Sequence, residues 1–146
     1  MNNFFKYLLF LIPWFISSLI IKIDTSYYNN LNLPFFALPS FLFPIVWTIL
    51  YIIIALYIFI TYDRYNSEYL KYLIINFITN QLYTYLFFSL KNNFLAVIDI
   101  LIVLYSAIKL YNITKFNYKK PSYLIIPYII FSIYALILST SILFLN

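Results

Sequence analysis

The sequence predicts an all-α integral membrane protein built as a bundle of five transmembrane helices. Hydrophobic residues make up 65% of the 146-residue chain and charged residues only 9%. Soluble globular chains, by contrast, carry roughly a quarter charged residues. The apolar residues fall into five runs, each close to the roughly 20 residues that cross about 30 Å of hydrocarbon. Short polar segments separate these runs, as expected for loops between membrane-spanning helices.

We expect residues 1–146 to form one membrane domain, with helices at about 4–21, 44–62, 69–90, 94–111 and 122–145. No A-x-A-like cleavage site follows the first apolar run, so it is expected to be a retained helix rather than a signal peptide. Residues 22–39 form the only long connection, and Asn112–Pro121 is interpreted as a basic loop. The other connections are short, which predicts that consecutive helices lie antiparallel and adjacent. Pro127 is expected to kink the fifth helix.

The positions of the basic residues predict the orientation of the bundle. Seven lysines and arginines lie on the side of the N-terminus and of the second and fourth loops, against Lys22 and Lys91 on the other side. The positive-inside rule therefore places the N-terminus in the cytoplasm. Because helical bundles are unusual in a bacterial outer membrane, we expect a multi-pass protein of the bacterial cytoplasmic membrane, with the lipid bilayer as its surroundings. The net charge of +5 is scattered, so no nucleic-acid partner is expected.

The residues that the chain lacks exclude several kinds of chemistry. With no cysteine and no histidine, the chain has no disulfide, no ordinary zinc site, no Ser-His-Asp triad and no haem ligation by those side chains. We therefore expect no metal site, no catalytic residue and no required cofactor, and we favour a binding protein over an enzyme. Glycine is absent too, so serine and alanine must let the helices approach closely.

Aromatic residues form a stripe at the start of the second helix. Pro39 and Pro44 suit a helix entry, because proline is tolerated in the first turn. Beyond them Phe43, Trp47 and Tyr51 recur at i, i+4 and i+8, which puts their rings on one face. One interpretation is an aromatic wall for a flat hydrophobic ligand. The other is an interfacial aromatic belt with ordinary helix packing.

The third helix carries a polar stripe of Asn76, Asn80, Thr84 and Phe87, with Tyr83 beside it. An unpaired amide in hydrocarbon costs several kcal/mol, so this face must point into the bundle. The stripe either joins helices by hydrogen bonds or binds a ligand inside a cavity.

Two further features lie at membrane depth in the last two helices. Asp99 is the only acid in a predicted membrane-spanning segment, and such acids are often functional. A proton relay would need a partner acid or histidine, so we expect Asp99 near the interface or capped by a tyrosine hydroxyl or a lysine. In the fifth helix Tyr128, Phe131, Ala135 and Leu138 share one side, where Ala135 leaves room beside the rings.

Four segments together resemble the translocator protein family, also called tryptophan-rich sensory proteins or peripheral-type benzodiazepine receptors. Pro39–Tyr51 is similar to the family's P-x-W-x-F-x-P-V-W-T-x-L-Y, and Asn80–Phe88 resembles N-x-x-W-S-x-x-F-F. Leu95–Leu101 is similar to the opening of the fourth helix, where an acid often occupies the position of Asp99. Ile126–Ser139 resembles V-P-Y-L-x-W-x-x-F-A-x-x-L-N. The resemblance covers essentially the whole chain, with the segments in the right order and at the right spacing.

The resemblance implies a five-helix bundle, often dimeric, that binds porphyrins, steroids and synthetic aromatic drugs beneath its first loop. Tyr83 and Phe131 stand where the family usually has tryptophan, and Ser139 stands where it has asparagine. The tryptophans of the first loop are replaced by phenylalanine. Porphyrin breakdown in the family is tied to tryptophans, notably the one at the position of Phe131, so the resemblance supports binding here more than breakdown.

We therefore predict a receptor- or sensor-like membrane protein that binds porphyrins, such as a protoporphyrin, or other flat hydrophobic ligands such as sterols. The alternatives are transport of such ligands, their photo-oxidative degradation through Trp47, and a structural membrane protein that has lost its ligand. The predicted ligand-binding residues are Phe43, Trp47, Tyr51, Asn80, Tyr83, Thr84, Phe87, Phe131 and Ala135.

Overall fold

In the computed structural model, which describes residues 2–64, 66–117 and 119–146, the chain is helical and those ranges contain no strand. The elements in chain order are α1 (Asn3–Leu11), η1 (Ile12–Phe15), α2 (Ile16–Ile20), α3 (Thr25–Asn30), α4 (Leu42–Thr61), η2 (Tyr62–Arg64), α5 (Ser67–Thr84), η3 (Tyr85–Ser89), α6 (Asn93–Asn117), α7 (Lys119–Ser122), η4 (Tyr123–Ile125) and α8 (Ile126–Leu145).

Within the described ranges, four helical stretches are long and apolar enough to cross a membrane: Asn3–Ile20, Leu42–Thr61, Asn93–Phe116 and Lys119–Leu145. The remaining long helix, α5, has 18 residues but includes Asn76, Asn80 and Gln81. These amides, together with Glu68 and Lys71, lower its apolar character. The all-helical membrane fold is thus confirmed, with four helices meeting the criteria for a span.

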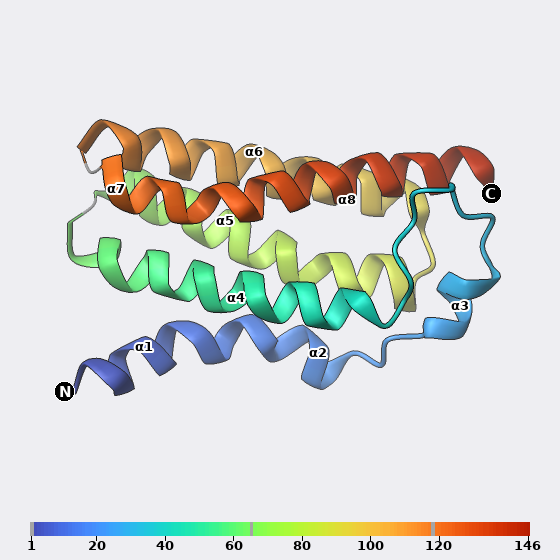
Figure 1. The fold of residues 1–146 in the computed structure, drawn as a ribbon, viewed down its shortest axis with the longest axis horizontal. Helices are drawn as coiled ribbons and strands as arrows, with labels where there is room; N and C mark the ends of the chain where they lie inside the picture. The colour runs from blue at the N-terminus through green and yellow to red at the C-terminus, as the bar shows by residue number, and fades with distance from the viewer. Residues whose placement is uncertain (1, 65, 118) are drawn as a thin grey trace.

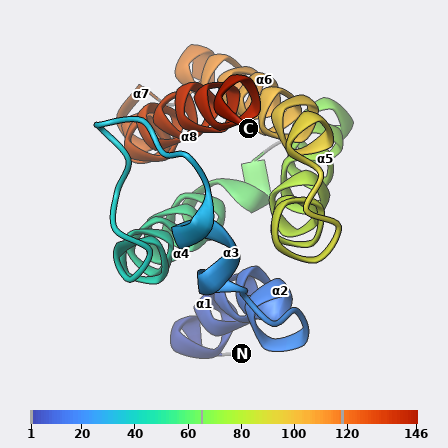
Figure 2. The same ribbon diagram turned by 90° about the vertical axis from the view of Figure 1, so that its right-hand side faces the viewer.

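The long helices run side by side along the longest axis of the molecule (Figure 1). Seen from the end, they form a ring in the order α1 with α2, α4, α8, α6 and α5, and α3 lies across that end (Figure 2). α4 and α5, which are consecutive in the chain, meet through their side chains and not by close backbone packing. Large side chains separate the two helices: Tyr57 and Tyr69 place their rings 6.3 Å apart between them.

Several boundaries differ from those predicted. The basic loop expected at Asn112–Pro121 is wrong for most of its length, because α6 continues to Asn117 and α7 starts at Lys119; residue 118 lies outside the described residues. The long first connection contains a short helix, α3, whose first turn is capped by Asp24. The third predicted helix ends in a π-helical turn, η3, instead of a regular α-helix.

Prolines mark two places where the helices change type. Pro13 lies within the 3₁₀ segment η1, between α1 and α2. Pro127 occupies the first turn of α8, directly after the 3₁₀ segment η4. At that position proline displaces no hydrogen bond within α8. Within the predicted fifth helix the change of helix type thus lies directly before Pro127, and the kink expected there stays a prediction.

Small residues allow the close helix contacts. Ala55, Ala96 and Ala107 are completely buried, as are Ser106 and Ser132. They lie on α4, α6 and α8, and the closest backbone packing in the bundle is between α5 and α6 and between α6 and α8. Alanine and serine thus do provide the close approach that glycine supplies in many membrane bundles.

Candidate ligand-binding site

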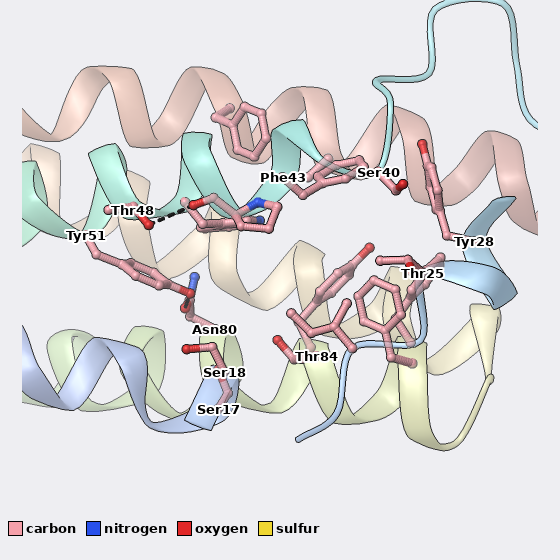
Figure 3. A pocket seen from close by; sticks show the side chains of 18 of the residues that line it. Ser17, Ser18, Thr25, Tyr28, Ser40, Phe43, Thr48, Tyr51, Asn80 and Thr84 are labelled. Carbon is pink, nitrogen blue, oxygen red and sulfur yellow. Dashed lines mark hydrogen bonds between the residues drawn. The ribbon is translucent and has the colours of Figure 1, made fainter. Parts of the chain in front are cut away.

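A cavity of about 180 Å³ lies at the α3 end of the bundle, among α2, α4, α5, η3 and α8. Figure 3 shows Tyr51 and Asn80 at one end of this cavity, and Thr25, Tyr28 and Ser40 of the long first connection at the other. Its wall is mostly apolar and contains no lysine, arginine, aspartate or glutamate.

All of the residues predicted from the sequence to bind a ligand line this one cavity. They come from three helices and the π-helical turn, and they are Phe43, Trp47, Tyr51, Asn80, Tyr83, Thr84, Phe87, Phe131 and Ala135. The structure therefore brings the predicted residues together. Ligand binding by them remains a prediction.

Trp47 forms the centre of one wall. Its ring centroid lies 5.6 Å from that of Tyr51 and 5.3 Å from that of Phe131, the second pair edge to face. Ala135, one turn further along α8, also faces the cavity. Near the loop, the ring of Phe43 packs edge-on against Tyr28 of α3 at 5.2 Å. The aromatic stripe thus faces the bundle interior, where it can contact a ligand.

The opposite wall depends on the end of α5. The rings of Tyr83 and Phe87 are parallel to within 7°, with centroids 5.8 Å apart. The hydroxyls of Tyr83 and Ser139 are 2.7 Å apart and hydrogen-bonded. The π-helical turn η3 adds a residue to the helical turn, and both Phe87 and Phe88 line the cavity. Such π-bulges often occur at functional sites.

Asn80 lies on the cavity wall but is largely engaged with the protein. Its Oδ1 accepts hydrogen bonds from Tyr51 Oη (3.0 Å) and Gln81 Nε2 (3.2 Å), and its Nδ2 donates to Tyr128 Oη (3.1 Å). An amide nitrogen carries two hydrogens, so a single N–H is left for a ligand. Asn80 therefore both joins helices and faces the cavity.

Asn76 lies one turn from Asn80 and serves packing alone. It is completely buried and does not line the cavity. Its Nδ2 donates to Val103 O and Ser106 Oγ, both at 2.9 Å, and its Oδ1 accepts from Tyr128 Oη at 3.0 Å. Of the two interpretations of the polar stripe, hydrogen bonding between helices holds for Asn76.

Four hydroxyls on the cavity wall make no hydrogen bond to other described residues: those of Ser17, Thr25, Ser40 and Thr84. The backbone N–H of Ser17 is bound by Gln81 Oε1 at 2.9 Å, which holds this residue against α5. The cavity thus offers a few polar groups within an apolar wall, as small-molecule sites usually do.

The rest of the lining was not among the predicted binding residues. These residues are Phe15, Ser17, Ser18, Ile23, Thr25, Tyr28, Ser40, Pro44, Thr48, Phe88, Leu138 and Ile142. Leu138 belongs to the stripe noted on the fifth helix, and Pro44 was noted as part of the entry to the second helix. Thr25 and Tyr28 had no signal, because the loop packs against the cavity only in three dimensions.

The loop that covers the cavity is held mainly by side-chain bonds. Asp24 pairs with Lys91 at 3.2 Å, and the N–H of Tyr27 together with Lys91 lowers the pKa of Asp24. Further along, Leu38 N donates to Tyr134 Oη (3.0 Å) and Asn32 N to Asn146 Oδ1 (2.9 Å). Tyr28 and Phe36 add apolar contacts with the bundle. Because the polar contacts are partly exposed, the loop is expected to open at a lower cost than the helices.

Asp99 is buried within the bundle. Its side chain is 3% exposed, and its Oδ2 has no hydrogen-bond partner among the described residues. The expected capping by a tyrosine hydroxyl or a lysine is therefore wrong for this oxygen. Asp99 does not line the cavity, so it takes no part in the candidate site.

Taken together, the apolar helices and the aromatic cavity define a helical integral membrane protein with an internal cavity. The family model described as the TspO/MBR family matches residues 7–145, and the chain belongs to this family.

Relatives of this chain carry names consistent with that family. The chain is 32% identical over 136 residues to "Tryptophan-rich protein TspO" of Bacillus cereus, which covers 91% of this chain and 89% of that protein. It is 30% identical over 128 residues to the protein of the same name from Archaeoglobus fulgidus, covering 83% and 80%. It is also 34% identical over 124 residues to "Uncharacterized membrane protein YtaB" of Bacillus subtilis, covering 82% and 80%. The family resemblance inferred from the motifs is thereby confirmed.

Proposed function

We propose that this protein is a receptor- or sensor-like membrane protein that binds flat hydrophobic ligands, metal-free porphyrins in particular, in the aromatic cavity. One observation carries the proposal: the rings of Trp47, Tyr83 and Phe131, from three different helices, surround one enclosed space. Stacking and burial of apolar surface would supply most of the affinity, since aromatic contacts add to the gain from burial.

The polar groups of the cavity suit a neutral or weakly polar ring system. The hydroxyls of Ser17 and Thr84 and the remaining N–H of Asn80 can orient it by hydrogen bonds. Neither histidine nor cysteine occurs in the chain to ligate a haem iron. We therefore expect the metal-free porphyrin to bind better than haem, and we propose no bound cofactor.

The size of the cavity sets a condition on binding. At about 180 Å³ it is smaller than the roughly 300–1,000 Å³ of typical ligand sites. A tetrapyrrole must therefore enlarge it. The loop from Ile21 to Phe41 is the part that can yield, because side-chain hydrogen bonds and one ion pair hold it over the cavity. We propose that it moves outward when a ligand enters.

The exposed residues of the cavity wall indicate that a ligand enters the cavity from the membrane. Ser18 of α2 and Pro44 and Thr48 of α4 are exposed members of the cavity wall, and the backbones of α2 and α4 are not neighbours. A hydrophobic ligand dissolved in the bilayer would thus enter between these two helices. This favours ligands that partition into lipid.

We propose the following placement in the membrane. The polar face of α5 is turned inward, toward Val103, Ser106 and Tyr128, so α5 can cross the bilayer as a fifth span despite its amides. With the N-terminus in the cytoplasm, as the distribution of lysines predicts, the loop containing α3 lies outside. We further propose a bacterial cytoplasmic membrane, because helical bundles are unusual in a bacterial outer membrane, and a homodimer, as the family resemblance implies.

Binding is proposed over light-driven breakdown of the ligand. Trp47 is the one tryptophan in the lining of the cavity, and the second tryptophan of the chain, Trp14, does not face it. Phe131, whose ring packs against Trp47, lacks the readily oxidised indole. Transport would need flux across sealed vesicles, which a sensor would not produce.

Titration of the purified protein with metal-free protoporphyrin tests the proposal. We expect a saturable change in the porphyrin absorption band, with one ligand per chain and a dissociation constant of about 1–10 μM, corresponding to roughly 7–8 kcal/mol. Haem is expected to bind more weakly. A linear, non-saturating signal equal to that of empty detergent micelles would show that the porphyrin only partitions into the apolar phase.

A further inference from the structure

A second hollow lies at the other end of the bundle, on its lipid-facing side. This groove has a volume of about 550 Å³ and runs between α1 with η1 and the first half of α5. It is lined by Leu9, Phe10, Pro13, Trp14, Ile58, Tyr62, Asn66, Ser67, Tyr69, Leu70, Leu73, Ile74 and Phe77. It shares no residue with the aromatic cavity, so it is a separate site.

The groove opens toward the hydrocarbon of the membrane. Its rim residues Leu9, Leu70 and Ile74 are 59%, 54% and 48% exposed, on helices whose outer faces are apolar. Its floor contains the buried ring of Trp14, which packs edge to face against Phe77 at 5.3 Å. Only a molecule of the bilayer reaches such a rim, so the occupant must itself be a membrane component.

Polar groups occur at one end of the groove only. Tyr62, Asn66 and Ser67 lie there, and Lys6 Nζ donates to Tyr62 Oη at 2.8 Å. The carboxylate of Asp63 also acts electrostatically on this ammonium group. This polar end, which we call the mouth of the groove, therefore offers an ammonium group and hydroxyl groups, while the rest of the groove is apolar. This distribution matches an amphiphile with an anionic group at one end.

The length of the groove matches one leaflet. From Ser67 to Phe77 the helix α5 advances ten residues, or about 15 Å. This is half of the roughly 30 Å of a bilayer core. An acyl chain that begins at the mouth would thus end near the bilayer centre, beside Trp14.

We propose that this groove binds one acyl chain of a glycerophospholipid, with the lipid phosphate at the ammonium group of Lys6. The site is independent of the proposed porphyrin site, and it fixes a lipid in the leaflet on the side of the N-terminus. Burial of the chain against Leu73, Ile74 and Phe77 provides the affinity, and Lys6 selects a lipid with a phosphate.

The two tryptophans of the chain make a direct test available, because Trp14 lies in the groove and Trp47 in the cavity. The Trp47→Phe variant keeps Trp14 as the sole tryptophan. It is reconstituted in bilayers of phosphatidylglycerol with brominated acyl chains, which quench tryptophan fluorescence on contact. We expect strong quenching of Trp14 although its ring is only 2% exposed.

Matched variants then show whether the chain lies in the groove. Leu73→Phe fills it, and quenching of Trp14 is expected to fall by about half or more, since the ring replaces the acyl contacts. Ile78→Phe, on the exposed outer face of α5, is expected to leave quenching unchanged. Ile74→Phe serves as a second filling variant if Leu73→Phe does not fold.

The phosphate contact is tested with a second lipid. Brominated diacylglycerol, which lacks the phosphate, is expected to quench Trp14 less than the phospholipid when each is diluted in unbrominated lipid, and Lys6→Gln is expected to remove this difference. The proposal is overturned if Trp14 is not quenched by the brominated phospholipid. It is also overturned if Trp14 is quenched as strongly in both filling variants as in Ile78→Phe. Equal quenching by both lipids in the protein with Lys6 would also overturn it. Porphyrin binding plays no part in these readouts.

Discussion

Replacing Ala135 with phenylalanine is expected to weaken porphyrin binding at least tenfold, or by about 1.4 kcal/mol or more. Ala135 is 7% exposed and lines the cavity on the same helix as Phe131. A ring at this position projects into a space of only about 180 Å³ and occupies volume that the ligand needs. The measurement is the dissociation constant from the porphyrin titration.

The control for this variant is the same change of size on the same helix. Ile137→Phe alters a residue that is 52% exposed on the outer face of α8, and its affinity for porphyrin is expected to equal that of the unmodified protein. If Ala135→Phe binds porphyrin as tightly as Ile137→Phe does, the ligand does not occupy the cavity. Thermal unfolding of both variants verifies that each is folded.

Asn76→Leu is expected to lower the free energy of unfolding by about 2 kcal/mol. The change removes three hydrogen bonds, to Val103 O, Ser106 Oγ and Tyr128 Oη, and such bonds between membrane helices are worth roughly 0.6–1.7 kcal/mol each. Leucine has the same number and branching of heavy side-chain atoms as asparagine, so the substitution leaves no cavity and the loss reflects the missing hydrogen bonds. Unfolding in mixed micelles with increasing sodium dodecyl sulfate measures the difference.

Asn112→Leu is the matched control for this stability effect. Asn112 is exposed on α6, and the same substitution there is expected to change the free energy of unfolding by less than about 0.5 kcal/mol. A loss at Asn76 no larger than the loss at Asn112 would contradict the assignment of Asn76 as the centre of the hydrogen bonds that join α5, α6 and α8.

The sequence was sufficient to predict the lining of the cavity contributed by α4, α5 and α8. The aromatic residues of α4 recur every four positions, at Phe43, Trp47 and Tyr51. They therefore share one face of the helix, whatever direction that face points in the bundle. Asn80 had to point inward because hydrocarbon does not solvate an amide. The family resemblance then related this face to Phe131 and Ala135 of α8, and the structure places all of them around one cavity.

Other features depend on contacts that no local pattern carries. Thr25 and Tyr28 reach the cavity only because α3 folds back across the end of the bundle. Helical periodicity assumes a regular helix and so did not predict the π-helical turn at Tyr85–Ser89. Lysines 115, 119 and 120 suggested a loop, but charged residues are also common at the ends of helices, and here α6 continues to Asn117.

The amides show why the two interpretations of the polar stripe could not be separated from the sequence. Asn76 and Asn80 are one turn apart on the same face, and both are buried. They differ in what lies opposite: α6 packs tightly against the first, and the cavity lies beside the second. The cavity lies beside Asn80 because α4 and α5 are held apart there. That separation depends on how all of the helices assemble.

An experimental structure of the protein prepared with metal-free protoporphyrin tests the central claim most directly. The account predicts planar density between Trp47, Tyr83 and Phe131, with the loop from Ile21 to Phe41 displaced outward to make room. Density found only on the lipid-facing surface, with the cavity and its covering loop unchanged, would contradict it.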